Sequence, residues 1–365
     1  MAHVHLPLPG TPQNDLDTPC LIIDLPVMEQ NIKTMADFLA DKPARIRPHF
    51  KTPKSPAIAH KQMAAGAIGV CAAKVGEAEV LAFNGIQDIL IANQVVGRTK
   101  ISRLMALCTC AQMMVAVDDP GNVAMLSEAA VGSGVALRVL VEVNVRLNRC
   151  GVEPGRPAAD LAAVIERSPG LAFAGLMGYE GQVRIADFEQ RAVETRRAMD
   201  KLLVSKEAVE KAGLPVEIVS AGSTSTWNIT STIAGITEIQ AGSYVFMDAA
   251  YRYIPDFGNA LFLVATVVSR PKKGLAIIDA GMKALSLDEG LPEVLQPSGA
   301  KLTRLSEEHG TLEVQGEAEE LGPGDKVVIL PSHGDTTINM HEQYFVVRDG
   351  ELAAVWEIAA RGRFR

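Results

Sequence analysis

The sequence predicts a (β/α)8 barrel followed by an all-β domain, and three observations lead to this α/β fold class. Between Arg45 and Gln240, eight short apolar stretches alternate with segments of helical pattern, as in a parallel sheet covered by helices. Beyond about Asp256, apolar runs are separated instead by Gly, Pro and Asp turns. An open, doubly wound sheet is the competing architecture, but no G-x-G-x-x-G follows the first of these strands.

The elements of the first part follow one another in a regular rhythm. A buried strand is expected at 18–24 and a helix from Pro26 to Leu39. The eight expected barrel strands are 45–50, 68–71, 88–92, 113–117, 137–143, 171–177, 216–220 and 237–240. Helices are expected at 76–83, 99–108, 121–131, 158–167 and 188–212. Eight such strand-and-crossover units in about 200 residues indicate a closed barrel.

The second part has the pattern of antiparallel strands. Strands are expected at 260–268, 274–279, 311–315, 326–330, 343–347 and 352–356. Turn sequences such as Pro323-Gly-Asp325 separate them. We therefore expect a barrel over 18–255 and a β-strand domain formed by 1–17 and 256–365.

Composition excludes several classes of function. The chain of 365 residues has 48% hydrophobic residues, enough for a large domain and a smaller one. A net charge of −8 argues against nucleic acid or an anionic membrane as partner. The first ten residues lack a signal-peptide pattern, and no apolar stretch approaches the roughly 20 residues that span a bilayer.

Cysteine usage indicates a cytoplasmic protein. The five cysteines are an odd number and lie mostly in apolar runs, which is typical of reduced packing residues. Cys108 and Cys110 are too close in sequence for a usual zinc pair, so we expect them to continue a helix.

Lys51, at the end of the first expected barrel strand, is a candidate for a Schiff-base lysine. In barrels the C-terminal strand ends face the active site, and Pro53 is expected to stop the strand and open a helix. Arg45, Arg47 and Lys54 make the neighbourhood basic. Nearby cations and partial burial favour the neutral amine that a nucleophilic lysine needs. A solvated basic turn is the alternative interpretation.

Two Gly-Ser loops follow the seventh and eighth expected strands, at 220–225 and 240–244. The loops after these two strands of a barrel commonly form a phosphate site. Small residues allow backbone N–H groups to approach phosphate oxygens, while Ser223, Thr224 and Ser243 can add hydroxyl donors. Either loop alone would be read as an ordinary turn, and the two together indicate a phosphate site.

Two further side chains follow the fifth and sixth expected strands. Arg149 would face the barrel mouth, where a fixed cation can bind a phenolate oxygen or a carboxylate. Tyr179 offers an aromatic wall or a hydroxyl donor. A surface position is the alternative for Arg149.

In the β domain, His333 and Asp335 are candidate metal ligands. Two residues apart in a turn, an imidazole nitrogen and a carboxylate can point at one ion and leave positions for water or substrate. Because the pair contains no thiolate, it favours Mn²⁺ or Mg²⁺ over Zn²⁺. The alternative is a turn with a hydrogen-bonded histidine.

These features together resemble the pyridoxal-phosphate enzymes of fold type III, which have the alanine-racemase fold. Within that group the chain resembles the metal-dependent D-threonine aldolases and the related eukaryotic-type D-serine dehydratases. The resemblance runs from about Thr18 to the end. The motifs that carry it are 47–54, 74–78, 93–97, 149–152, 240–248, 333–335 and 355–364.

The resemblance implies roles for these positions. Lys51 would form the Schiff base with pyridoxal 5'-phosphate, Arg149 would contact its phenolic oxygen, and Tyr179 would lie against its ring. The phosphate would be held by Gly222, Ser223, Thr224, Gly242, Ser243 and Tyr244. His333 and Asp335 would bind the divalent metal, with His333 also acting in catalysis, and the chain would form a homodimer.

The implied reaction is the cleavage of a D-β-hydroxy-α-amino acid, of the D-threonine type, to glycine and an aldehyde. The main alternative is dehydration of D-serine or 3-hydroxy-D-aspartate by β-elimination. A racemase would leave His333 and Asp335 without a purpose, and the small proteins of this fold that bind the cofactor without clear catalysis lack a β domain. A substrate with a second carboxylate needs an extra cation, for which Arg146 and Arg252 are candidates.

Overall fold

The computed structural model describes residues 6–365, and the chain divides into two compact units. The barrel unit comprises 35–51, 58–242 and 363–365, and the β-rich unit comprises the other described residues. Residues 1–5 lie outside the described residues. They are part of the stretch without a signal-peptide pattern and of the expected domain segment 1–17. The expected domain boundaries at 18 and 255 stay a prediction.

The barrel unit is built on a parallel sheet of eight strands in the order β2-β9-β8-β7-β6-β5-β4-β3. Its strands are β2 (Arg45–Ile46), β3 (Val70–Ala72), β4 (Asp88–Ile91), β5 (Gln112–Val117), β6 (Leu137–Glu142), β7 (Leu171–Met177), β8 (Ile218–Ala221) and β9 (Glu238–Ile239). An isolated parallel bridge between His49 and Cys71 joins the two ends of this series. The prediction of eight parallel barrel strands is confirmed.

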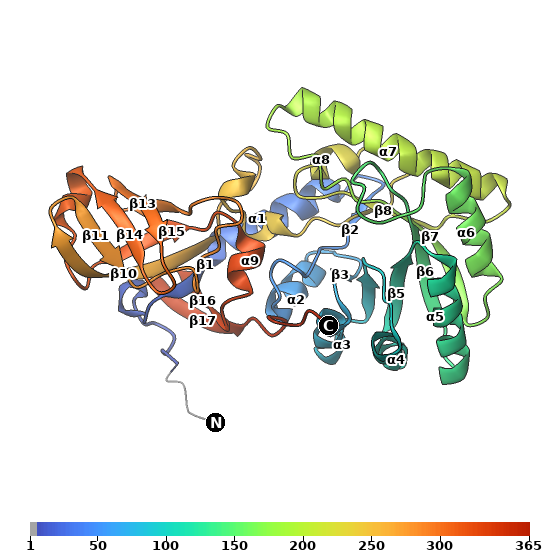
Figure 1. Ribbon diagram of the computed structural model, residues 1–365, viewed down its shortest axis with the longest axis horizontal. Coiled ribbons are helices and arrows are strands. Elements are labelled where there is room, and N and C mark those ends of the chain that lie inside the picture. Colours follow the sequence, from blue (N-terminus) through green and yellow to red (C-terminus); the bar gives the residue numbers. More distant parts are fainter. Residues whose placement is uncertain (1–5) are drawn as a thin grey trace. The chain divides into compact units, whose positions relative to one another are not determined.

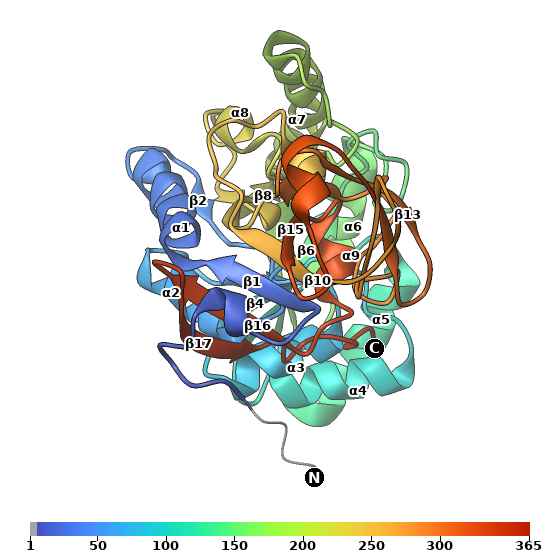
Figure 2. The same cartoon turned by 90° about the vertical axis from the view of Figure 1, so that its left-hand side faces the viewer.

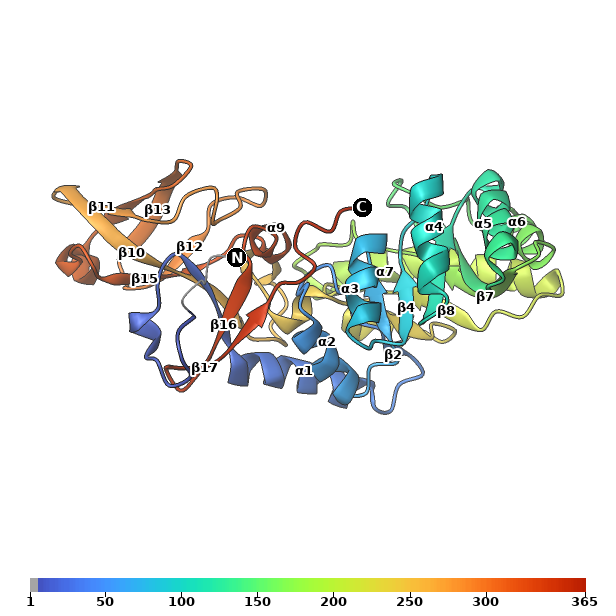
Figure 3. The same ribbon diagram turned by 90° about the horizontal axis from the view of Figure 1, so that it is seen from below.

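Helices cover the outside of this sheet. They are α2 (Pro56–Ala64), α3 (Val75–Phe83), α4 (Arg98–Leu107), α5 (Pro120–Ser133), α6 (Arg156–Glu166), α7 (Phe188–Lys211) and the short α8 (Trp227–Thr230). Figure 1 shows α4 to α6 following one another in chain order around the strands, and Figure 3 shows the same order from below. A buried cluster draws side chains from six neighbouring strands: Cys71, Leu90, Met114, Ala116, Leu140, Ala174, Met177 and Ile218.

The first barrel strand is shorter than expected and its helix starts later. β2 ends at Ile46, because Pro48 has no N–H to donate to a regular ladder. Pro53 lies in a turn and does not open the helix. The helix begins at Pro56, where proline's fixed φ suits the first helical position. Lys51 therefore lies on a turn between the strand and α2.

The β-rich unit contains a nine-stranded sheet with the path β13-β14-β11-β10-β1-β16-β17, and β15 pairs with β10 and β12. Its strands are β1 (Cys20–Asp24), β10 (Leu261–Lys272), β11 (Leu275–Ile278), β12 (Glu293–Gln296), β13 (Ala300–Leu305), β14 (Gly310–Val314), β15 (Lys326–Leu330), β16 (Gln343–Arg348) and β17 (Glu351–Glu357). Figure 2 shows β1, β16 and β17 side by side. The expected all-β texture of the C-terminal part is confirmed.

Strand β1 joins the β-rich unit although it lies within the range expected for the barrel. It pairs antiparallel with β10 and parallel with β16. Four of its five residues are buried, so this strand has a partner on each side and packs as a central strand. Cys20 and Ile22 enter a core with Val264, Phe345 and Val347. The helix α1 (Leu25–Leu39) follows directly.

Several smaller predictions are wrong. Cys108 and Cys110 do not continue the helix, since α4 ends at Leu107 and the hydrogen bond from the Cys110 N–H returns only three residues, to the Leu107 carbonyl. Strands β12 and β13 were not expected, because they are short and half-exposed and are flanked by Pro292, Pro297 and Gly299. Within residues 6–365, no helix is both long and apolar enough to cross a membrane.

Candidate active site

Two predicted residues of the barrel unit lie beside the aromatic ring of a third. Tyr179 follows β7, and its half-buried ring has the Lys51 Nζ at 6.0 Å and the Arg149 Cζ at 5.3 Å from its centroid. Both cations lie within the range at which an aromatic face attracts positive charge. Lys51 comes from the turn beyond β2 and Arg149 from the loop after β6. The parallel strands therefore bring together side chains that are up to 128 positions apart in the chain (179 − 51).

The expected basic neighbourhood of Lys51 is partly neutralised. Arg47 is almost fully buried, and its guanidinium pairs with Glu238 at 2.7 Å and with Asp88 at 2.5 Å. These carboxylates belong to β9 and β4, so the ion pairs tie together strands of the sheet. Arg47 therefore has a structural role and supplies no uncompensated charge.

A buried carboxylate that was not expected lies at the end of β6. Glu142 is 4% exposed, and its Oε2 accepts a hydrogen bond of 2.6 Å from the Gln94 side chain. Burial raises the pKa of Glu142, whereas Gln94 and the charge of Arg149 oppose the shift. A charged residue at the end of an apolar strand was the available signal. Glu142 provides this part of the barrel unit with a carboxyl group beside Arg149.

The loop after β8 carries the predicted residues Gly222, Ser223 and Thr224, all of them buried. The Gly222 N–H donates to Glu180 Oε2 at 3.1 Å, and the Ser223 N–H donates to Thr226 Oγ1 at 3.0 Å. Gly222 has a φ of +85°, a conformation that glycine adopts without strain. The loop is therefore held in one shape by its own hydrogen bonds and by Glu180.

The loop after β9 lies beside the loop after β8, because the two strands pair in parallel. The Gln240 side chain donates to Ser220 Oγ at 2.8 Å and links the two strand ends. Gly242 is the last residue of this segment in the barrel unit. The structure thus brings Gly242 to the same edge of the sheet as Gly222.

The other two predicted phosphate ligands belong to the β-rich unit. Ser243 and Tyr244 are buried in a 3-10 turn (Ser243–Val245), and the Tyr244 ring packs against Phe257 with centroids 5.5 Å apart. The predicted set is therefore divided between the end of one unit and the start of the other.

The predicted metal ligands lie at the start of α9 (Gly334–Ile338) in the β-rich unit. His333 immediately precedes the helix, and Asp335 lies in its first turn. The His333 Nδ1 is 2.6 Å from Asp288 Oδ2, while Asp288 Oδ1 accepts from Ser286 Oγ at 2.6 Å and from Thr336 Oγ1 at 3.0 Å. Because a carboxylate can only accept, Nδ1 carries the proton, which leaves Nε2 as the ring nitrogen that can bind a metal.

Asp248, which follows the second Gly-Ser loop, supports the same segment. Its Oδ2 accepts a 2.7 Å hydrogen bond from the N–H of Gly334, the residue between His333 and Asp335. Its buried Oδ1 has no hydrogen-bond partner among the described residues. Burial raises the pKa of Asp248 to about 6, against the opposing effects of the Gly334 N–H and His333. An imidazole nitrogen and a carboxylate, as in His333 and Asp335, fit a divalent cation, and Asp248 holds the backbone between them.

Within residues 6–365, no three His, Cys, Asp or Glu side chains form a ready-made metal cluster. A metal held by His333 and Asp335 would therefore keep several positions for water or substrate, as catalytic sites do. Among the residues missed by sequence reasoning, Asp248 had a signal, because it ends a motif that carried the resemblance. Asp288 had none, since 45 residues separate it from His333.

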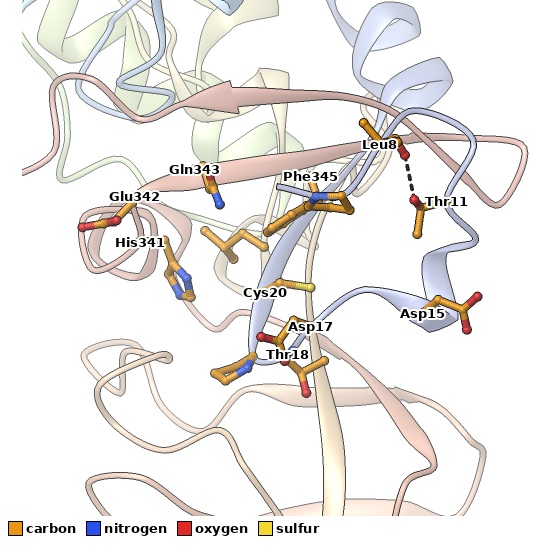
Figure 4. A pocket seen from close by; sticks show the side chains of 13 residues that line it. Leu8, Thr11, Asp15, Asp17, Thr18, Cys20, His341, Glu342, Gln343 and Phe345 are labelled. Atoms are coloured by element: carbon orange, nitrogen blue, oxygen red, sulfur yellow. Dashed lines mark hydrogen bonds between the residues drawn. The ribbon is translucent and has the colours of Figure 1, made fainter. Parts of the chain in front are cut away.

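A cavity of about 680 Å³ in the β-rich unit contains none of the predicted site residues. Figure 4 shows that it is lined by the segment before β1 and by residues around the start of β16, among them Asp17, Cys20 and His341. Burial raises the pKa of Cys20 to about 12, so its thiol stays protonated.

Two protein families match the chain. The family described as alanine racemase, N-terminal domain, matches residues 23–250, and the family described as putative serine dehydratase domain matches residues 260–347. Their order along the chain agrees with a barrel followed by a β-rich part.

Individual relatives match over nearly the full length. The chain is 38% identical to a 3-hydroxy-D-aspartate aldolase of Paracoccus denitrificans, over 98% of this chain and 95% of the relative. It is 37% identical to a D-threonine aldolase of an Arthrobacter species, over 97% of this chain and 95% of the relative. The solved D-threonine aldolase of Filomicrobium marinum is 42% identical, with a TM-score of 0.94 over 98% of this chain and 99% of that one. The chain therefore belongs to the family of alanine-racemase-fold enzymes that includes the D-threonine aldolases and the 3-hydroxy-D-aspartate aldolases.

Proposed function

We propose that the chain is a lyase that cleaves the Cα–Cβ bond of D-β-hydroxy-α-amino acids, giving glycine and an aldehyde. The observation that carries this proposal is the placement of the Lys51 amine and the Arg149 guanidinium against the ring of Tyr179. A lysine beside an aromatic wall and a fixed cation suits a cofactor that is an aromatic aldehyde with a phenolic oxygen. The relatives that are named aldolases support the same reaction.

The side chains around Tyr179 and the loop after β8 fit pyridoxal 5'-phosphate. Lys51 would hold the cofactor covalently, Tyr179 would lie against its ring, and Arg149 would contact its phenolic oxygen. The phosphate would be held by Gly222, Ser223, Thr224, Gly242, Ser243 and Tyr244. When bound, the cofactor supplies an electron sink for the pair of electrons that the broken bond leaves on Cα.

His333 and Asp335 would hold the divalent metal, which when bound lowers the pKa of a coordinated hydroxyl group. Asp288 keeps the Nδ1 proton of His333 in place, so the lone pair of Nε2 is available to the metal. The all-N/O donor set favours Mn²⁺ or Mg²⁺ over Zn²⁺. Lys51 Nζ is the group that would exchange a proton at Cα, and partial burial of this amine limits its contact with water.

The ligand pair favours the aldolase over a dehydratase. Two solved structures of a D-threo-3-hydroxyaspartate dehydratase carry replacements of a histidine and of a cysteine two positions later, the second in the metal-free form. The present chain has an aspartate two positions after His333 and no cysteine beyond Cys150. A hard carboxylate in place of a thiolate suits Mn²⁺ or Mg²⁺ bound to a substrate oxygen.

The candidate cations for a second substrate carboxylate are both paired. Arg146 lies 2.5 Å from Glu194 on the surface of the barrel unit, and Arg252 forms an ion pair with Glu293 in the β-rich unit. Arg252 is engaged by Glu293, and Arg146 is engaged by Glu194, which it shares with Arg197. Both candidate guanidinium groups are therefore already bound to a carboxylate of the chain. We therefore propose an uncharged β-substituent, as in D-threonine, as the preferred substrate class.

Product analysis tests the proposal. The metal-loaded protein is incubated with D-threonine, D-serine and D-3-hydroxyaspartate, with and without a chelator. Glycine plus an aldehyde, lost on chelation, is the expected result, with D-threonine turned over faster than D-3-hydroxyaspartate. Ammonia plus an oxo acid would overturn the aldolase in favour of β-elimination.

We also propose that the chain is a cytoplasmic homodimer. All five cysteines are free thiols, which fits a reducing compartment. The resemblance to dimeric enzymes of this fold supports the assembly state. Light scattering on the purified protein is expected to give twice the chain mass of 38.9 kDa, and a monomer would contradict the proposal.

A further inference from the structure

Glu180 is a fully buried carboxyl group to which the proposed reaction gives no role. It follows Tyr179 directly after β7 and has 0% exposure. A buried ionisable group without partners would be strongly unfavourable, so its hydrogen bonds indicate what it does. Burial raises the pKa of Glu180, and hydrogen bonds from Thr226, Thr230 and Gly222 oppose that shift.

All three hydrogen bonds come from the segment after β8. Glu180 Oε1 accepts from Thr226 Oγ1 at 2.6 Å and from Thr230 Oγ1 at 2.8 Å, and Oε2 accepts from the Gly222 N–H at 3.1 Å. These donors stand at the start of the loop, at its end and at the end of α8. One side chain therefore fixes three points of the segment that carries Ser223 and Thr224.

Thr226 transmits this constraint into the loop. Because its hydroxyl proton is directed to Glu180, Thr226 Oγ1 can only accept from the Ser223 N–H at 3.0 Å and from Ser223 Oγ at 3.2 Å. Ser223 Oγ in turn accepts from the Ser225 N–H at 3.2 Å. The positions of the Ser223 backbone and hydroxyl thus depend on an acceptor at Glu180.

We propose that Glu180 is a positioning residue for the phosphate group of the cofactor: it holds the loop at 222–226 in the shape that presents Ser223 and Thr224 to the phosphate. This inference rests on the proposed function. A glutamine would not replace Glu180, because its amide has one acceptor oxygen where the site needs both carboxylate oxygens as acceptors. The NH₂ group of the amide would face another donor.

The test compares pyridoxal 5'-phosphate with pyridoxal, which lacks only the phosphate. Each compound is titrated into full-length protein freed of cofactor, and the visible absorption of the bound form gives its affinity. The ratio of the two affinities isolates the contribution of the phosphate, because general damage to the fold weakens both ligands. For Glu180→Gln we expect the ratio to fall about tenfold or more, as on loss of hydrogen bonds to a charged group.

A second pair of variants tests the same inference in case the Glu180→Gln protein does not fold. Thr226→Ser keeps the hydroxyl and is expected to keep the wild-type ratio, whereas Thr226→Val is expected to lose about as much as Glu180→Gln. The ³¹P resonance of the bound cofactor should shift in Thr226→Val and not in Thr226→Ser. Thr195→Val is the matched control, since this buried hydroxyl donates only within its own helix, to the Arg191 carbonyl.

The outcomes separate the inference from the proposed function. Unchanged ratios and ³¹P resonances in Glu180→Gln and Thr226→Val would overturn the role of Glu180, while the cofactor assignment would stand. A wild-type protein that binds neither compound would overturn the proposed function, and the inference with it. Equal loss of ratio in Thr226→Ser and Thr226→Val would show that the hydroxyl chain is not the cause, which also overturns the inference.

Discussion

The two units place their candidate residues by different means. In the barrel unit, Lys51, Arg149 and Tyr179 stand beyond the C-terminal ends of parallel strands, so the hydrogen bonds of the sheet set their positions. In the β-rich unit, His333 and Asp335 lie on a turn and a short helix, which Asp288 and Asp248 hold by side-chain hydrogen bonds. A site built on strand ends depends on the sheet as a whole, whereas a site built on a turn depends on a few specific contacts. Substitutions should therefore act differently in the two units.

The largest effect is expected for Lys51→Ala in the barrel unit. The variant loses the amine that would bind the cofactor, while the surrounding strands keep their hydrogen bonds. We expect the visible band of bound pyridoxal phosphate to disappear and turnover to fall at least about a thousandfold, as when a covalent group is removed. Absorption spectroscopy and product assays measure both. An intact band in this variant would contradict the assignment of Lys51.

The next effect is expected for Asp335→Asn in the β-rich unit. The amide keeps the size of the side chain but lacks the charge that binds a hard divalent ion. Mn²⁺ affinity can be measured from the electron paramagnetic resonance of free Mn²⁺. Replacing a residue that only supports a metal ligand typically lowers affinity about 10- to 100-fold, and the loss expected for Asp335→Asn is larger. The pyridoxal phosphate band should stay, because Asp335 is not among the residues that would hold the cofactor. If Asp335→Asn lost both the cofactor band and Mn²⁺ binding, the view that substitutions act separately in the two units would be wrong.

The barrel candidates could be inferred from a local sequence pattern, whereas the residues that support the candidates of both units could not, for a physical reason. A parallel strand ends where its apolar run ends, and the next residues must lie at one edge of the sheet, so Lys51 and Tyr179 followed from a local pattern. Glu180 was missed although it is the next residue, because its partners lie 42 to 50 positions later in the chain. Asp288 was missed for the same reason. Long-range hydrogen bonds leave no local pattern, whereas strand ends do.

A smaller effect is expected for Asp288→Asn, which tests the supporting contacts of the turn. An amide nitrogen facing His333 Nδ1 would no longer favour the tautomer that leaves Nε2 available. Mn²⁺ affinity should fall about 10- to 100-fold, and high Mn²⁺ should restore much of the turnover. Glu289→Gln, at the exposed neighbouring position, is the matched control and should bind Mn²⁺ like the wild type. Equal Mn²⁺ affinity in Asp288→Asn and in the control would show that Asp288 does not support metal binding by His333.

The smallest effect concerns pH, where buried carboxyl groups and the histidine His341 should contribute in opposite directions. In the barrel unit burial raises the pKa of Glu142 and of Glu180, so the folded form holds protons more tightly than the unfolded chain. Their contribution to stability is greatest at low pH and is lost as the pH rises through the raised pKa values. In the β-rich unit burial lowers the pKa of His341 below its ordinary 6.5, against the opposing hydrogen bond of 2.8 Å between Nε2 and the Ala284 carbonyl.

The contribution of His341 to stability therefore changes with pH in the opposite direction to that of Glu142 and Glu180. Below pH 6.5 the unfolded chain takes up a proton at this position that the folded chain resists, so the contribution of His341 to stability falls as the pH drops through the window beneath 6.5. His341→Gln keeps a donor for the Ala284 carbonyl and removes the titration. The variant should lose less stability than the wild type between pH 7 and pH 5, because it has no group at this position that takes up a proton on unfolding. Urea midpoints at the two pH values measure this difference, with the exposed His309→Gln as control. A difference of the same size in His309→Gln would assign the acid sensitivity to charge in general and not to the buried histidine.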